Sequence, residues 1–141
     1  MIDDKMRAEL IEKAILAREN AYTPYSHFMV GAALLTKSGK IYTGCNIECS
    51  TYSPTVCGER TAFFKAVSEG ERDFVAIGIV GGFEGEPLRD EAYPCGVCRQ
   101  VMSEFCGKDF EIILGSSKDN FHVHTLEEIL PYSFVLEEHK L

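Results

Sequence analysis

The side chains most suited to chemistry lie in two short motifs. Residues 55–60 read TVCGER, and residues 94–100 read PCGVCRQ. Together the two motifs supply three thiols and one carboxylate, those of Cys57, Cys95, Cys98 and Glu59. Three thiolates on Zn²⁺ leave one coordination position open, which favours a catalytic over a structural site. Glu59 follows Cys57 closely enough to stand beside a zinc-bound water without ligating the metal.

Both motifs open predicted helices. Apolar residues recur at helical spacing over residues 56–69 and 95–105, and a glycine follows each run as a stop signal. The dipole of each helix favours thiolate over thiol in its first turn. Because Cys95 and Cys98 are three residues apart, a helix places both thiols on one face, where they can bind one metal ion.

Two other interpretations of the cysteines stay open at this point. A structural zinc site would need a fourth ligand, such as Cys45, Cys49 or a histidine, and the spacing does not exclude one. Structural sites, however, usually combine two C-x-x-C units, and Cys57 has no such mate. A redox pair of Cys95 and Cys98 would leave the first motif without a purpose. The catalytic zinc site is therefore favoured.

Two further helices are expected near the ends of the chain. Asp3 or Asp4 can cap the first, which carries an apolar face and ends near residue 20. The last covers residues 126–130, where Thr125 and Glu128 fit a capping box. The chain thus places helices before, between and after its strands.

Strands are expected over residues 28–36, 41–46, 74–80, 110–114 and 121–124. The continuous apolar run of residues 74–80 is typical of a buried parallel strand. The pattern predicts a single α/β domain, residues 1–141, whose mixed sheet is covered by helices. Both motif helices follow strands of this sheet, so their first turns can meet at one edge. The charged tail, residues 137–141, is expected to be frayed.

Composition limits the partners and the compartment. The 141 residues carry a formal net charge of -8, which argues against a nucleic-acid partner and for a small neutral substrate. No signal peptide or membrane span is visible in the sequence. A reducing, cytoplasmic setting is expected, with Cys45, Cys49 and Cys106 as small buried residues.

Beyond the two motifs, three segments carry a resemblance to a known family. Residues 21–28 read AYTPYSHF, residues 44–48 read GCNIE, and residues 130–134 read LPYSF. With the motifs, they make the chain similar to the cytidine deaminases, in the small branch whose zinc ligands are all cysteines. The resemblance implies a three-layer α/β/α fold with a five-stranded mixed sheet. It also implies one zinc ion per chain, bound by the three motif cysteines, and a homotetramer with shared active sites.

The resemblance assigns roles in catalysis. Glu59 would move protons between the attacking water, ring N3 and the departing ammonia. Arg60 would hydrogen-bond to the ligand sulfurs and withdraw negative charge from the metal site. The backbone N–H of Gly58 would bind the pyrimidine O2, although alanine is commoner in the family at this position. Glycine retains that N–H, so having glycine instead of alanine here affects only the rigidity of the start of the helix.

The resemblance also assigns substrate contacts. Asn46 and Glu48 would bind the ribose 3′-hydroxyl, because an amide and a carboxylate can satisfy a hydroxyl as donor and acceptor. Phe28 and Tyr52 would line the pyrimidine and sugar pocket, and Phe134 would reach it from a neighbouring subunit.

The expected activity is the zinc-dependent hydrolysis of cytidine and 2′-deoxycytidine to uridine and 2′-deoxyuridine with release of ammonia, in pyrimidine salvage. Two alternatives share parts of the pattern. One is a deaminase for a blasticidin-S-type antibiotic or a free base on the same fold. The other is a non-catalytic module that zinc merely stabilises.

Overall fold

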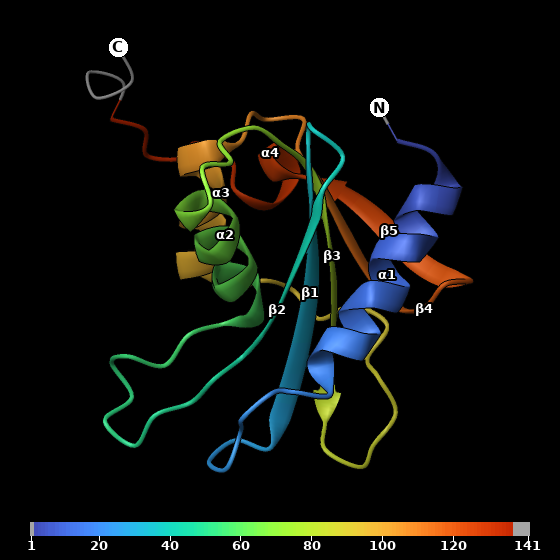
Figure 1. The fold of residues 1–141 in the computed structure, drawn as a ribbon, viewed down its shortest axis with the longest axis vertical. Coiled ribbons are helices and arrows are strands. Elements are labelled where there is room, and N and C mark those ends of the chain that lie inside the picture. Colours follow the sequence, from blue (N-terminus) through green and yellow to red (C-terminus); the bar gives the residue numbers. More distant parts are fainter. Residues whose placement is uncertain (1, 137–141) are drawn as a thin grey trace.

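A computed structural model describes residues 2–136 (Figure 1). The tail at residues 137–141, expected to be frayed, lies outside the described residues. The elements are α1 (Asp4–Arg18), β1 (Phe28–Thr36), β2 (Ile41–Cys45), α2 (Gly58–Ser68), β3 (Phe74–Phe83), α3 (Gly96–Phe105), β4 (Glu111–Ser117), β5 (Asn120–Thr125) and α4 (Leu126–Ile129). This order confirms the helices and strands expected from the sequence. Both capping predictions hold: Asp3 caps α1, and Thr125 and Glu128 form a capping box at α4.

The strands form one mixed sheet in the order β2-β1-β3-β4-β5. β1 pairs antiparallel with β2 and with β3, and β5 pairs antiparallel with β4. β3 and β4 are parallel. The apolar run predicted as a parallel strand therefore has one parallel and one antiparallel neighbour, and it extends to Phe83.

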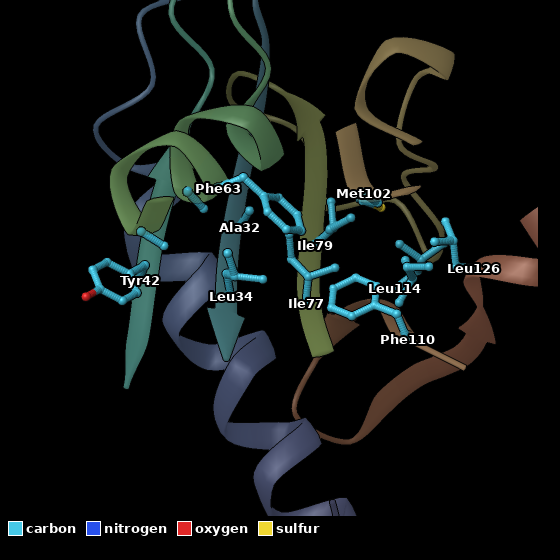
Figure 2. Close-up of a cluster of buried hydrophobic side chains, with 13 residues drawn as sticks. Ala32, Leu34, Tyr42, Phe63, Ile77, Ile79, Met102, Phe110, Leu114 and Leu126 are labelled. Atoms are coloured by element: carbon cyan, nitrogen blue, oxygen red, sulfur yellow. The ribbon is translucent and has the colours of Figure 1, made fainter. Parts of the chain in front are cut away.

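Helices cover both faces of the sheet. Because side chains alternate along a strand, Ala32 and Leu34 face α2, α3 and α4, whereas Ala33 and Leu35 face α1. Phe63 of α2 is fully buried in the first of these clusters (Figure 2). Figure 1 shows α1 on one side of the sheet and α2 and α3 on the other. The fold thus has the three α/β/α layers that were expected.

Strand direction brings the two motif helices together. β2 and β3 are both antiparallel to β1, so they run in the same direction and end at the same edge of the sheet. α2 follows β2 and α3 follows β3, each after a connecting loop. Both helices therefore begin near that edge. No helix in the described part of the chain is long and apolar enough to cross a membrane.

Candidate active site

The three motif thiols converge where α2 and α3 begin. Cys57 is the N-cap of α2 and Cys95 is the N-cap of α3, while Cys98 lies in the first turn of α3. The Sγ of Cys95 lies 3.6 Å from that of Cys57 and 3.5 Å from that of Cys98. Tetrahedral Zn²⁺ with Zn–S bonds of about 2.3 Å requires sulfurs about 3.8 Å apart. The cluster therefore fits a zinc ion.

Among the described residues, these cysteines form the one group of three or more His, Cys, Asp or Glu side chains whose potential ligand atoms all lie within 4.8 Å of one another. The other cysteines, Cys45 and Cys49 included, lie outside it, so no fourth cysteine closes the site. Cys45, Cys49 and Cys106 are half-buried rather than buried, which corrects that expectation. Each lies at the end of an element or in a loop, where packing covers only part of the side chain.

The surroundings of the thiols favour negative charge. Contacts from the thiol of Cys98 and from Arg60 lower the pKa of Cys57 to about 5 despite partial burial. The same contact with Cys57, together with burial, raises the pKa of Cys98, so the proton of the pair stays on Cys98. A metal ion would replace that proton, because thiols release protons when they bind zinc.

Arg60 places a positive charge beside the motif thiols. Its Nη2 donates to the Sγ of Cys57 at 3.4 Å. Its Nε is buried and has no hydrogen-bond partner in the described structure. A partly buried guanidinium beside sulfur atoms offsets part of the charge that three thiolates would bring to one metal ion. This placement fits the electrostatic role predicted for Arg60.

Glu59 lies in the first turn of α2, next to the thiol cluster. Its side chain is only 3% exposed. Burial, and then the nearby Cys57 thiolate, raise the pKa of Glu59 to about 7. A carboxyl group in such surroundings can hold or release a proton near neutral pH, which suits an acid-base role.

A cavity of about 400 Å³ opens onto this cluster. Its wall contains five residues that the sequence assigned to the site: Phe28, Asn46, Cys57, Glu59 and Cys95. A larger hollow of about 650 Å³ lies beside α4 and the segment that follows it. None of the predicted site residues lines that hollow. The smaller cavity is therefore the candidate active site.

Asn46 and Glu48 occupy different positions. Asn46 lines the cavity. Its side chain also holds the start of β1, because its Nδ2 donates to Phe28 O and its Oδ1 accepts from Val30 N, both at 2.8 Å. Glu48 is absent from the cavity wall, and its carboxylate accepts from the backbone N–H and hydroxyl of Ser26. Glu48 thereby anchors a residue that does line the cavity.

Three other predicted contacts lie away from the cavity wall. Tyr52 is 71% exposed and Phe134 is 69% exposed. Gly58 is buried as the first residue of α2, directly before Glu59. Neither aromatic ring therefore closes the site within its own chain.

The loop between β3 and α3 adds residues that sequence reasoning missed. Arg89, Glu91, Ala92 and Tyr93 line the cavity. The guanidinium of Arg89 lies over the ring of Phe28, 5.2 Å from its centre. The sequence showed only a polar, glycine-containing loop here. The one available signal was proximity to Cys95 in the chain.

The approach of α2 to β2 depends on the absence of a side chain at Gly44. A Cβ there would lie 2.5 Å from Gly58 O and 2.6 Å from Ala62 N. We expect Gly44→Ala to displace the start of α2, to lower the unfolding free energy by about 1–3 kcal/mol, and to weaken zinc binding. Gly96→Ala is the matched control, because a Cβ at this first residue of α3 would meet no atom within 4 Å.

Thermal unfolding and zinc titration of both variants would check this expectation. If Gly44→Ala matched Gly96→Ala in both measurements, close packing at Gly44 would not position the site.

Comparisons with known proteins agree with this geometry. A family model described as the cytidine and deoxycytidylate deaminase zinc-binding region matches residues 4–114. The chain is 48% identical over 132 residues to the cytidine deaminase of Halalkalibacterium halodurans, covering 94% of this chain and 96% of that protein. It is 34% identical over 133 residues to the blasticidin-S deaminase of Bacillus cereus, covering 89% of this chain and 90% of that protein.

A solved structure is similar to this chain in fold as well as in sequence. The crystal structure of cytidine deaminase from Burkholderia pseudomallei superposes with a TM-score of 0.80 at 44% identity. The match covers 89% of this chain and 97% of that one. The similarity therefore extends over the fold as well as the motifs.

Proposed function

Since the chain belongs to the cytidine and deoxycytidylate deaminase family, we propose that it hydrolyses cytidine and 2′-deoxycytidine to uridine and 2′-deoxyuridine with release of ammonia. One observation carries the proposal. The buried carboxyl of Glu59 and the thiols of Cys57 and Cys95 line the same cavity, which is large enough for a nucleoside-sized ligand.

Zinc held by Cys57, Cys95 and Cys98 would supply a Lewis acid that makes hydroxide available near neutral pH. The reaction adds water at C4 of the ring and releases the amino group as ammonia. Glu59 accepts the proton from water on its carboxylate and delivers it to ring N3. Glu59 then takes the proton of the hydroxyl group added at C4 and passes it to the departing nitrogen. The C4–N bond breaks, C4 becomes a carbonyl carbon, ammonia leaves, and the carboxylate is regenerated.

Other residues orient the ring and tune the charge. Phe28 offers an aromatic surface in the cavity, and Asn46 fixes the start of β1 through its hydrogen bonds to the backbone of Phe28 and Val30. We assign the pyrimidine O2 contact to the backbone N–H of Gly58. Arg60 keeps the sulfur cluster from becoming too negative, which preserves the acidity that the metal provides.

Sugar recognition involves the segment around β2. We assign the ribose 3′-hydroxyl to Asn46 and Glu48. Tyr52, which lies outside the cavity of its own chain, would contribute to the pocket only in the assembly proposed below. The bonds of Glu48 to Ser26 support this role indirectly, because they hold that residue at the cavity wall. The carboxylate retains acceptor positions for a hydroxyl.

We propose a homotetramer in which neighbouring subunits complete each site. Large exposed aromatic side chains support this assembly: Tyr52 and Phe134 are 71% and 69% exposed, and neither lines the cavity of its own chain. Exposed apolar surface of this kind is typical of contacts between protein chains. The Gln100 side chain donates to Phe134 O, which ties that segment to α3.

The assembly predicts that Phe134→Ala lowers kcat/KM although the residue lies outside its own chain's cavity. Losing a buried phenyl contact costs about 1.5–3 kcal/mol, or roughly tenfold to a hundredfold. Leu16→Ala is the control, since Leu16 is 64% exposed on α1. Sedimentation equilibrium and cytidine turnover would be measured together. A fully active monomer would contradict the shared site.

The proposed setting is pyrimidine salvage in the cytoplasm. The described cysteines are all free, and thiolate ligands require reduced cysteines. A small pocket and a formal net charge of -8 favour a free nucleoside over a nucleic acid.

Ammonia release from cytidine by the purified protein tests the proposed activity. Activity should be lost after chelation and return with added Zn²⁺. Because a blasticidin-S deaminase is among the relatives, blasticidin S and cytosine should be assayed beside cytidine and 2′-deoxycytidine. Faster turnover of the antibiotic or of the free base would replace the proposed substrate. Zinc without any turnover would indicate a non-catalytic module.

A further inference from the structure

β5 holds one segment of the cavity wall through alternate residues. Asn120, His122 and His124 share one face of this strand, since side chains alternate along it. The Nδ2 of Asn120 donates to Asp90 Oδ1 at 2.9 Å. The ring of His124 lies 5.9 Å from that of Tyr93. The loop that leads into α3 is therefore held in place by a strand that follows α3 in the sequence.

Glu91 is the centre of these contacts. The Nε2 of His122 lies 3.8 Å from Oε1 of Glu91, and the Nε2 of His124 lies 3.5 Å from Oε2. The hydroxyl of Tyr93 also donates to Oε2. The buried Nε2 of His124 has no hydrogen-bond partner among the described residues, so the carboxylate is the acceptor within its reach.

Glu91, whose carboxylate these three side chains contact, is part of the cavity wall. Glu91 lines the same cavity as Glu59, and its side chain is 24% exposed. The Tyr93 hydroxyl, with help from His122 and His124, lowers the pKa of Glu91, so its carboxylate is ionised at neutral pH. A carboxylate has about four acceptor positions, and the three neighbours leave capacity for a ligand in the cavity.

We propose that Glu91 is a substrate-binding carboxylate, which accepts a hydrogen bond from a donor group of the nucleoside, and that His122 and His124 are its positioning residues. This inference rests on the proposed function. It extends the site from the two motif helices to β5. The donor is a sugar hydroxyl or the ring amino group, and the test separates these two sources.

Turnover of cytidine by the wild-type protein tests the proposed function. The inference about Glu91 is tested separately, by the KM and kcat of each variant relative to those of the wild type. Glu91→Gln keeps the size of the side chain but removes the charge. We expect its KM for cytidine to rise about tenfold, because hydrogen bonds to charged groups are the stronger ones, while kcat stays within about threefold. Zinc content should not change. Glu84→Gln is the control, since Glu84 is exposed in the same loop and does not line the cavity.

A double-mutant cycle between His124 and Glu91 tests the positioning role. His124→Phe keeps a ring beside Tyr93 but removes Nε2, and we expect KM to rise by about threefold to tenfold. His124→Gln restores an N–H donor and should lie nearer to wild type. In the Glu91→Gln background, His124→Phe should change KM by less than about twofold.

Inhibition by uridine identifies the donor, because uridine keeps the sugar and lacks the amino group. A raised inhibition constant for uridine in Glu91→Gln assigns the sugar, and an unchanged constant assigns the amino group. An unchanged KM in Glu91→Gln would overturn the substrate contact. Equal effects of His124→Phe with and without Glu91, or loss of zinc in His124→Gln, would overturn the positioning role.

Discussion

Replacing Glu59 with glutamine should lower kcat for cytidine by at least about 10²–10⁴-fold, because positioned proton transfer contributes that much per step. Glutamine keeps the size of the side chain but cannot accept and return a proton. Glu59 is outside the three-cysteine cluster and buried at the first turn of α2. The variant should therefore retain its zinc and its fold, and its affinity for cytidine need not fall in parallel.

Zinc analysis and single-turnover kinetics on the same sample would check this expectation. Glu69→Gln is the matched control, since Glu69 is exposed at the other end of α2. Near-normal turnover in a zinc-replete Glu59→Gln protein would remove Glu59 from the mechanism. Loss of zinc would make Glu59 a ligand or a structural support.

Replacing Cys98 with alanine should abolish both zinc binding and turnover. Its side chain is 1% exposed within the cluster, so no other group can take its place without rearrangement. Zinc affinity should fall by more than about 100-fold, which is the upper end for loss of a group that merely supports a ligand. Cys57→Ala and Cys95→Ala should behave in the same way.

Elemental analysis and ammonia release would be measured for these variants beside three controls. Cys45→Ala, Cys49→Ala and Cys106→Ala should retain one zinc per chain, because the metal-binding group contains only the three motif cysteines among the described residues. If a control variant lost its zinc, the site would have a fourth cysteine ligand, and the open coordination position needed for catalysis would be absent.

Much of the fold follows from local patterns in the sequence. Apolar spacing and stop signals located each helix and strand that the structure describes between residues 2 and 136, because these signals depend on neighbours within a few residues. Some boundaries differ from the predicted ones: β3 extends to Phe83 rather than residue 80, and β4 extends to Ser117 rather than residue 114. The differences at the two motif helices are smaller. Cys57 and Cys95 are N-caps rather than helical residues, since each has an extended backbone before the first turn. The chemistry of the motifs did not depend on that difference.

The sequence by itself determined the chemical groups of the site: the three thiols of the two motifs, the carboxylate of Glu59 and the guanidinium of Arg60. Only the tertiary structure decided which residues of the loop between β3 and α3 face the cavity. The carboxylate of Glu91 lies next to His122 and His124, and these contacts form only when β5 pairs with β4. No local periodicity encodes such contacts, because they depend on how separate strands align. Likewise, the exposure of Phe134 reflects packing of the whole chain rather than its neighbours in sequence.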